Sequence, residues 1–251
     1  DSGAPPRYAL RAIATRPRAE AEGLATALAA RGIDTIIEPM LEIRCFAGPP
    51  PDIAGVRAVL CTSANGVRAF ARACPERAVP LFAVGEATAA RAHAEGFAHV
   101  ESAGGAVGDL ARLVVERLDP RAGRLLHCTG NAVAGNLAGE LGAAGFSVER
   151  AVLYEARPAA ALSRTTAAAL AAGCIDVALF FSPRTAAIFV RLAAAAGLAA
   201  AMRRVAAISI SAAADAALTP LIFGERHIAR RPDQAGILAA LDPMIAARCG
   251  R

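Results

Sequence analysis

The sequence contains no lysine and no tryptophan, so each of the 27 residues counted as lysine or arginine is an arginine. The missing lysine excludes a Schiff-base amine, a Walker-type phosphate loop and a protein-kinase site. Arginine holds carboxylates and phosphates through paired hydrogen bonds. The net charge of +5 therefore suits nucleic acid or a polyanionic small molecule, although coding bias combined with solubility explains it equally well.

Aromatic residues are also scarce, at 4% of the chain, and no basic run is longer than Arg230-Arg231. Surfaces that bind nucleic acid gather basic residues, and many of them stack bases on aromatic rings. We therefore expect no nucleic-acid partner.

Long apolar runs are missing as well. The longest candidate, residues 192–202, contains Gly197 and is followed by two arginines, whereas a membrane span needs about 18 apolar residues. No basic segment followed by an apolar stretch opens the chain, so no secretory signal is predicted. We expect a soluble protein of the cytoplasm that does not contact a membrane.

Most sequence motifs of known catalytic or metal-binding sites are absent or incomplete. The six cysteines lie far apart without a C-x-x-C pair, and neither H-E-x-x-H nor G-x-S-x-G is present, so we predict no metal site and no disulfide framework.

Residues 130–137 have the glycine spacing of a phosphate loop, but Asn136 and Leu137 replace its Lys and Ser/Thr, which favours a helix start. Residues 104–108 follow no clear strand and are interpreted as a loop. His127 lies in a predicted strand and is interpreted as a core residue. Any reaction must then depend on positioning, backbone amides and weak acids.

The chain does contain an internal repeat. Residues 14–44 align without a gap on 127–157, residues 56–70 on 175–189 and, more weakly, residues 81–91 on 205–215. Each aligned segment has the pattern of an apolar strand, a turn and a helix. Thr15 is predicted to cap the first helix with Pro17 in its first turn, and the matched Gly32 and Gly145 are predicted to follow helix ends.

The order of the matched segments predicts that one domain is inserted into the other. We expect a discontinuous domain of residues 1–38 and 159–251, an inserted domain of residues 47–150, and linker strands at 39–46 and 151–158. Apolar strands that alternate with helices call for a parallel sheet with helices on both faces. The predicted fold class is α/β, with two similar flavodoxin-like domains joined by a two-stranded antiparallel linker.

Candidate binding residues follow from this architecture, because open parallel sheets bind ligands beyond the carboxyl ends of their strands. If both domains turn these ends toward one cleft, their turn residues surround a common ligand. The candidates are Thr15, Arg16, Ser63, Asn65, Gly85, Thr88, Ser182, Arg184, Ser209 and Ser211. Ser63 and Ser182, which the repeat aligns, are equally well explained as helix caps.

Tyr154 is a separate candidate, since the chain has only two tyrosines and this one lies in the returning linker. Its partner in the repeat is Leu41, so the fold itself does not require the hydroxyl group. Packing of the ring in the core is the alternative explanation.

Several segments occur in a recognisable order. They are Thr15-Arg16-Pro17, Thr62-Ser63-Ala64-Asn65-Gly66-Val67 with Phe70, Ala83-Val84-Gly85-Glu86-Ala87-Thr88-Ala89, Val152-Leu153-Tyr154-Glu155-Ala156, and Phe180-Phe181-Ser182-Pro183-Arg184-Thr185 with Phe189. No single segment is specific, but their combination over nearly the whole chain resembles the uroporphyrinogen-III synthase family.

The resemblance implies conversion of the linear tetrapyrrole hydroxymethylbilane into uroporphyrinogen III, with ring closure, inversion of ring D and loss of water. It implies a lyase of tetrapyrrole and heme biosynthesis that uses no metal or organic cofactor, and we expect a monomer. Tyr154 would be the catalytic general acid, because an unperturbed phenol, with a pKa of about 10, is a protonated donor at neutral pH. Ser63, Thr88 and Ser182 would hydrogen-bond substrate carboxylates.

The sequence departs from the family pattern at Ser209-Ile210-Ser211-Ala212, which lacks the Gly-Pro-Thr-Thr-like form of some members. The contribution of Ser209 and Ser211 therefore stays open, and no register is assigned to residues 219–233. A protein of another class also fits the pattern, namely a non-catalytic two-domain protein that closes on an anionic small molecule. The product isomers formed from hydroxymethylbilane distinguish the two.

Overall fold

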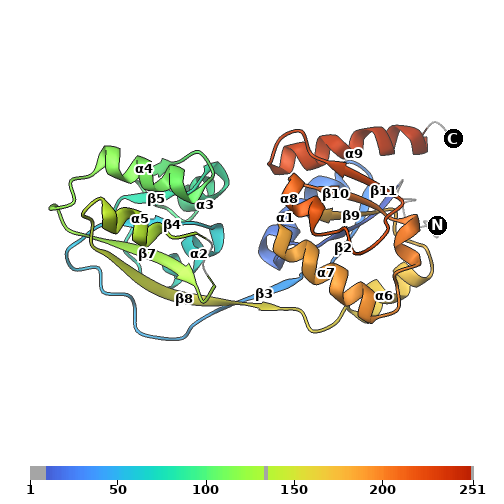
Figure 1. Ribbon diagram of the computed structural model, residues 1–251, viewed down its shortest axis with the longest axis horizontal. Helices are drawn as coiled ribbons and strands as arrows, with labels where there is room; N and C mark the ends of the chain where they lie inside the picture. The colour runs from blue at the N-terminus through green and yellow to red at the C-terminus, as the bar shows by residue number, and fades with distance from the viewer. Residues whose placement is uncertain (1–9, 133–134, 250–251) are drawn as a thin grey trace, which may run out of the picture. The chain divides into compact units, whose positions relative to one another are not determined.

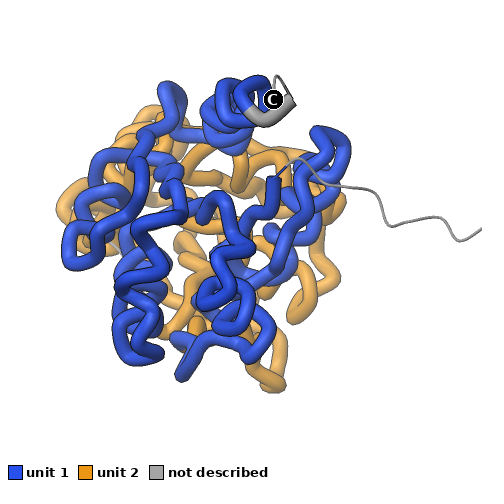
Figure 2. The backbone as a smooth tube through the Cα atoms, turned by 90° about the vertical axis from the view of Figure 1, so that its right-hand side faces the viewer, with its two compact units in different colours: residues 1–42, 158–251 blue, residues 43–157 orange. Residues whose placement is uncertain are grey.

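The chain folds into two compact units in a computed structural model that describes residues 10–132 and 135–249. Unit 1 consists of Asp1–Glu42 and Pro158–Arg251, and unit 2 of Ile43–Arg157 (Figure 2). Unit 2 is thus inserted between two segments of unit 1. Residues 1–9, Val133, Ala134, Gly250 and Arg251 lie outside the described residues, and with them both ends of the expected discontinuous domain and the middle of the phosphate-loop-like segment.

Unit 1 has a sheet of five strands in the order β11-β10-β9-β1-β2, with neighbouring strands parallel. The strands are β1 (Leu10–Ala14), β2 (Ile33–Ile37), β9 (Val177–Phe180), β10 (Ala206–Ser209) and β11 (Glu225–Ile228). The helices are α1 (Arg18–Ala29), α6 (Arg164–Ala171), α7 (Pro183–Ala195), α8 (Ala212–Ala216) and α9 (Gln234–Cys249), with a 3-10 turn at Ala201–Arg204 (Figure 1). Counted along unit 1, this strand order is that of flavodoxin-like folds.

Unit 2 has a sheet of six strands in the order β3-β8-β7-β4-β5-β6. The strands are β3 (Leu41–Cys45), β4 (Val56–Cys61), β5 (Leu81–Ala83), β6 (Val100–Ser102), β7 (Arg124–Gly130) and β8 (Val148–Pro158). The helices are α2 (Ala64–Ala73), α3 (Glu86–Ala94), α4 (Val107–Arg117) and α5 (Leu137–Ala143) (Figure 1). From β8 to β6 the strands are parallel. These strands, β8, β7, β4, β5 and β6, correspond to β2, β1, β9, β10 and β11 of unit 1, so the spatial order is the same although the order along the chain differs. The predicted α/β class with two parallel-sheet domains is confirmed.

Alternating strand residues explain why helices cover both faces of each sheet. In unit 1, α1 and α9 pack on the face that carries Leu10, Val177 and Ile208, whereas Phe180 meets Phe189 of α7 in an edge-to-face contact. In unit 2, α2 and α3 cover one face and α4 and α5 the other. Each unit therefore buries its own core.

Local signals decide most helix ends. Ser63, Ser163, Ser182 and Ser211 each accept a hydrogen bond from a backbone N–H in the first turn of the helix that they precede. Gly32 and Gly145 have φ angles of 70° and 89°, a backbone conformation that favours glycine.

Two expectations are corrected by the structure. Thr15 does not cap α1: the helix begins after Pro17, and no side chain caps it. Residues 104–108 do follow a strand, β6, and their last two residues form the first turn of α4 rather than a loop. A strand of only three residues was too short to be recognised from its pattern.

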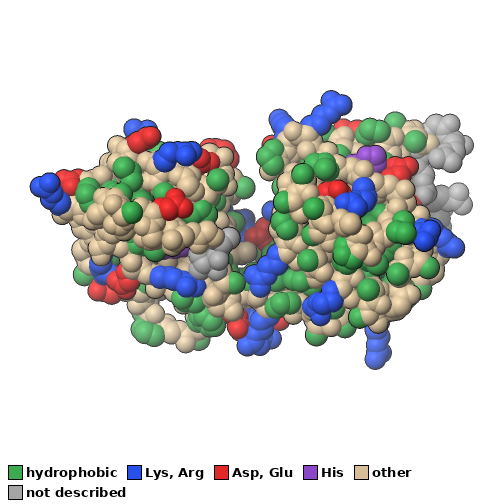
Figure 3. Space-filling view, viewed as in Figure 1, with side chains coloured by type: hydrophobic (Ala, Val, Ile, Leu, Met, Phe, Trp, Pro, Cys, Tyr) green, Lys and Arg blue, Asp and Glu red, His purple; other side chains and the backbone are tan. Residues whose placement is uncertain are grey.

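Across the described part of the chain, no helix is both long enough and apolar enough to cross a lipid bilayer. Figure 3 shows arginines interspersed with acidic residues on the face of each unit that it presents.

Candidate functional site

In unit 2 several candidate residues share the edge at the carboxyl ends of the parallel strands. Ser63 follows β4 and caps α2, Gly85 follows β5 and is the N-cap of α3, and Gly130 ends β7. The turns after these strands are the usual location of ligands in such sheets.

Tyr154 and Ser63 meet at this edge. The phenol oxygen of Tyr154 lies 3.1 Å from Oγ of Ser63, and the tyrosine is only 8% exposed. The same Oγ accepts a hydrogen bond from the N–H of Gly66 at 3.1 Å. The catalytic candidate and one of the binding candidates thus belong to a single hydrogen-bonded group, in which either hydroxyl can donate to the other.

Gly66 permits this arrangement because α2 lies close to β7. A Cβ atom at Gly66 would be 2.7 Å from the carbonyl oxygen of Cys128, which is closer than non-bonded atoms approach. The glycine therefore determines how near the start of α2, with Ser63 at its cap, comes to the sheet.

The remaining candidates of unit 2 line the same edge. Asn65 Oδ1 accepts a hydrogen bond from Arg68 at 3.1 Å, and Thr88 is buried in α3. A Cβ atom at Gly85 would lie 3.2 Å from Cα of Gly105. The turns after β5 and β6 therefore pack against each other through glycine backbone.

In unit 1, Arg16 lies at the carboxyl-end edge of that unit's own sheet. Its guanidinium group lies 4.3 Å from the ring centroid of Phe181. Arg16 also donates a hydrogen bond of 3.1 Å to Oε1 of Gln234. Ser182 caps α7 through the N–H of Thr185 at 3.1 Å, and Arg184 is exposed in the first turn of that helix. Stacking on an aromatic ring orients the planar guanidinium group.

Two further candidates of unit 1 are enclosed. Thr15 is fully buried, and its hydroxyl donates a 2.7 Å hydrogen bond to the carbonyl of Leu179. Ser209 is also fully buried, and its Oγ has no hydrogen-bond partner among the described residues. The cap of α8 is Ser211 instead. Both hydroxyls thus lie inside unit 1 rather than on its surface.

His127 is a core residue, as expected from its strand. It is 2% exposed, and its Nε2 lies 3.5 Å from Oγ1 of Thr62. Burial and then the charge of Arg150 lower the pKa of His127 to about 4, so the ring is neutral at neutral pH. A neutral ring of this kind is not a ready proton donor.

The buried thiol of Cys128 is equally unsuited to nucleophilic chemistry. A hydrogen bond with Cys61, followed by burial, raises its pKa well above the ordinary value. A thiol rather than a thiolate is therefore present at neutral pH, and the thiolate is the nucleophilic form. Among the described residues, no group of His, Cys, Asp and Glu side chains is arranged to hold a metal ion.

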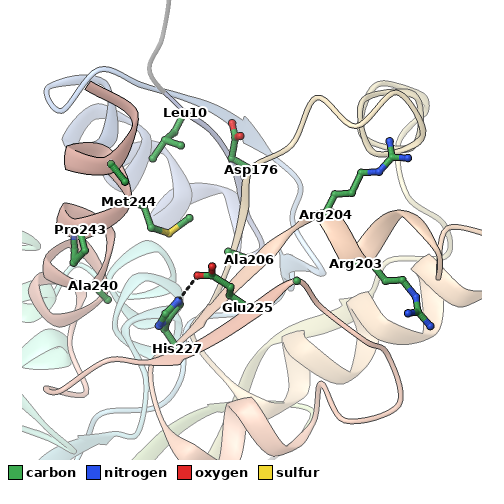
Figure 4. Close-up of a pocket in the computed structure, with 12 residues that line it drawn as sticks. Leu10, Asp176, Arg203, Arg204, Ala206, Glu225, His227, Ala240, Pro243 and Met244 are labelled. Atoms are coloured by element: carbon green, nitrogen blue, oxygen red, sulfur yellow. Dashed lines mark hydrogen bonds and ion pairs between the residues drawn. The ribbon is translucent and has the colours of Figure 1, made fainter. Parts of the chain in front are cut away.

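A cavity of about 660 Å³ lies at the other edge of the sheet of unit 1, beside the first residues of β1, β10 and β11 (Figure 4). In it His227 Nε2 lies 3.0 Å from a carboxylate oxygen of Glu225, and Asp176 accepts the N–H of Arg11 at 2.8 Å. The carboxyl-end candidates do not line this cavity.

Sequence reasoning missed three neighbours of the candidate residues. Phe181 and Gln234 contact Arg16, and Asn131 hydrogen-bonds the backbone on both sides of Glu155 in β8. In the sequence Asn131 falls within the phosphate-loop-like spacing of residues 130–137, and an asparagine at a strand end is itself a turn signal. The other two contacts join distant segments and leave no local pattern.

Comparisons with known proteins agree with this architecture. Residues 22–239 match a family model described as "Uroporphyrinogen-III synthase HemD". A uroporphyrinogen-III synthetase structure from Helicobacter pylori is similar with a TM-score of 0.63 at 16% identity, covering 94% of this chain and 99% of that one. A mutant uroporphyrinogen III synthase from Thermus thermophilus gives 0.57 at 17% identity, covering 95% and 99%. No curated protein sequence matches. At these identities the two structures show the fold, and the family model carries the assignment.

Proposed function

The chain belongs to the uroporphyrinogen-III synthase family, and we propose that Tyr154 is the general acid of its reaction. The family's enzyme closes hydroxymethylbilane to uroporphyrinogen III with inversion of ring D and loss of water, a step of tetrapyrrole and heme biosynthesis. The substrate of this chain is accordingly a linear tetrapyrrole.

The proposed acid step begins at the hydroxymethyl group of the substrate. The C–O bond breaks, the phenol proton of Tyr154 passes to the departing hydroxyl, and water leaves. Ring D then attacks the resulting azafulvenium cation through its substituted position to give a spiro intermediate, whose rearrangement inverts the ring. The proton that the closed ring finally loses returns the phenolate to the phenol.

The 3.1 Å contact between Tyr154 and Ser63 is the observation that carries this proposal. Ser63 Oγ already accepts the N–H of Gly66, and its own proton is available to the phenol oxygen. A hydrogen bond to the charged form favours that form. Ser63 therefore offers a hydrogen bond to the phenolate that remains after proton transfer.

Substrate carboxylates are held, in this proposal, by the polar groups at the carboxyl-end turns of the units. Arg16 offers a guanidinium group oriented by Phe181 and Gln234, and Arg184 an exposed one. Backbone N–H groups at the starts of α3 and α7, beside Gly85 and Ser182, suit the same ligands. Asn65 and Thr88 complete the set in unit 2.

We propose that the enzyme is a hydro-lyase that needs no cofactor. Substrate and product differ by one water molecule, so no electrons are gained or lost. The uncatalysed chain closes to the uninverted isomer, and the protein has mainly to orient the reacting ends. We further propose that the chain acts as a monomer in the cytoplasm, which sedimentation and cell fractionation test.

Replacing Tyr154 with Phe tests the acid role. We expect turnover to fall about 100-fold, the typical contribution of a positioned acid, while the product formed above the blank keeps its isomer composition. Freshly made hydroxymethylbilane is the substrate, and chromatography of the oxidised products separates the isomers. Tyr8→Phe is the matched control. Unchanged turnover of Tyr154→Phe would remove this residue from the chemistry.

The same assay addresses the alternative of a non-catalytic anion-binding protein, which the family match does not favour. A wild-type product mixture identical to the blank, together with tight binding of the tetrapyrrole, would support the binder.

A further inference from the structure

The turn that follows β7 is fastened to β8 beside Tyr154. The N–H of Asn131 donates to the carbonyl of Tyr154 at 3.0 Å, and its Oδ1 accepts the N–H of Ala156 at 3.3 Å. Its carbonyl oxygen accepts a hydrogen bond from the Arg150 guanidinium group at 3.3 Å. Asn131 is thus connected to β8 before, at and after Tyr154.

Gly130 forms the surface on which the tyrosine ring rests. A Cβ atom there would lie 2.7 Å from Cε2 and 2.9 Å from Cζ of Tyr154, so only glycine leaves room for the ring. Arg150 also donates to the carbonyl of Gly130, at 3.0 Å. The guanidinium group therefore holds the carbonyls of both residues of this turn.

An irregularity in the strand register orients the ring. Thr129 pairs with Val152, but Gly130 pairs with Tyr154, so β8 has one additional residue at this point. Such a bulge turns the following side chain relative to the regular alternation. The extra residue interrupts the regular pairing of β7 with β8, and the hydrogen bonds of Asn131 and Arg150 connect the two strands at this point.

We propose that Asn131 and Arg150 are positioning residues that hold the phenol of Tyr154 against Ser63. The proposal rests on the proposed role of Tyr154 as the acid. Both residues are exposed, so neither side chain belongs to the buried core, and their contacts converge on the tyrosine segment. They act through Tyr154 and do not touch the reacting atoms.

A double-mutant cycle tests this dependence. Asn131→Leu removes the acceptor for Ala156, Arg150→Met removes the donor to two carbonyls, and Asn131→Asp keeps an acceptor oxygen. We expect the first two to lower kcat about tenfold, as small misplacements of a reacting group do, with KM nearly unchanged, and Asn131→Asp to retain most activity. In the Tyr154→Phe background the same changes should have no further effect. Equal losses in both backgrounds would overturn the proposal.

A spectroscopic measurement gives an answer that does not depend on activity. The chain has two tyrosines and no tryptophan, so in a Tyr8→Phe protein the near-ultraviolet dichroism and acrylamide quenching of tyrosine report Tyr154 alone. We expect Asn131→Leu and Arg150→Met to weaken the dichroism and increase quenching, while Asn131→Asp stays near wild type. Arg112→Met, a change of an exposed arginine on α4, is the control.

The two measurements separate the possible failures. If Tyr154→Phe keeps full turnover but the spectra change as expected, the acid role fails and the positioning holds. If the spectra of both variants equal that of the Tyr8→Phe protein, the positioning proposal is wrong whatever the role of Tyr154. Far-ultraviolet dichroism at the assay temperature identifies a variant that has unfolded, and Gly130→Ala, which crowds the ring directly, then serves as the second probe.

Discussion

The carboxylate of Glu38 accepts two hydrogen bonds from Ser163, one from its backbone N–H at 2.9 Å and one from its hydroxyl at 2.5 Å, although 125 residues separate them. Glu38 follows β2, and Ser163 caps α6. The hydroxyl of Thr166 donates to the same carboxylate. The buried Glu38 therefore joins the two chain segments that form unit 1.

Replacing Glu38 with Ala should destabilise unit 1. The N–H and hydroxyl of Ser163 and the buried hydroxyl of Thr166 would lose their acceptor, which costs about 1–3 kcal/mol of unfolding free energy. Urea denaturation followed by circular dichroism measures the change. Glu116→Ala, an exposed position on α4, should change stability by less than about 0.5 kcal/mol. Equal effects of the two changes would contradict the role of Glu38.

Two glycine substitutions should have opposite signs. Gly66→Ala would place a Cβ atom 2.7 Å from the Cys128 carbonyl oxygen and should cost about 1–3 kcal/mol through displacement of α2. Gly23→Ala, in α1 with no atom within 4 Å of the added carbon, should stabilise by about 0.5–1 kcal/mol. Thermal unfolding of both variants is the measurement. A stabilised Gly66→Ala protein would show that α2 does not depend on this close approach.

Arg77 connects the ends of two helices in unit 2. Its guanidinium group donates to the carbonyls of Ala71, Cys74, Glu76 and Glu95 at 2.7–2.8 Å and lies 4.9 Å from the centre of the Phe97 ring. The carbonyls of Ala71, Cys74 and Glu95 stand at helix ends, where they lack intrahelical partners. Arg77→Met should therefore cost about 2 kcal/mol.

The matched control for Arg77 is Arg112→Met, since the side chain of Arg112 is 72% exposed and pairs with Asp109 in its own helix. Exposed pairs contribute at most about 1 kcal/mol. If Arg112→Met lost as much stability as Arg77→Met, the carbonyl contacts of Arg77 would contribute little in solution.

The free energy of unfolding should decrease as the pH is lowered, because of His127. Its pKa is about 4 in the folded chain against a reference value of 6.5, so the unfolded chain binds the proton more readily. The contribution of the neutral ring is complete above pH 6.5 and is lost as the pH falls toward 4. At 1.36 kcal/mol for each unit of pKa difference, the contribution amounts to about 3 kcal/mol when it is lost completely.

His127→Gln should flatten the dependence of unfolding free energy on pH between 6.5 and 4, while leaving its form above pH 7 unchanged. Subtracting the two profiles removes the contribution of the carboxylates, which both proteins share. Parallel profiles would show that His127 is protonated in the folded chain as easily as in the unfolded one.

Much of the architecture was predictable from local pattern. The match between residues 14–44 and 127–157 corresponds to the equivalence of β1-α1-β2 with β7-α5-β8. The sequence shows this match because a strand-helix-strand segment is specified by apolar periodicity and turn residues within about 30 neighbouring positions. Ser63 and Ser182 cap helices for the same reason, since a cap acts only over three residues. Short strands such as β6 carry too few residues for the pattern to stand out.

Thr15 and Ser209 show where sequence reasoning ends. Thr15 follows the apolar strand β1 and Ser209 ends the apolar strand β10. A pattern records only this position, but both residues are buried in the folded unit. Tyr154 and Ser63 meet across 91 residues, and Arg16 and Gln234 across 218. Composition and periodicity determined which elements form and in what order they repeat. Only the tertiary structure decided which side chains meet. Contacts between distant segments depend on which strands are neighbours and on their register, and a local sequence pattern contains neither.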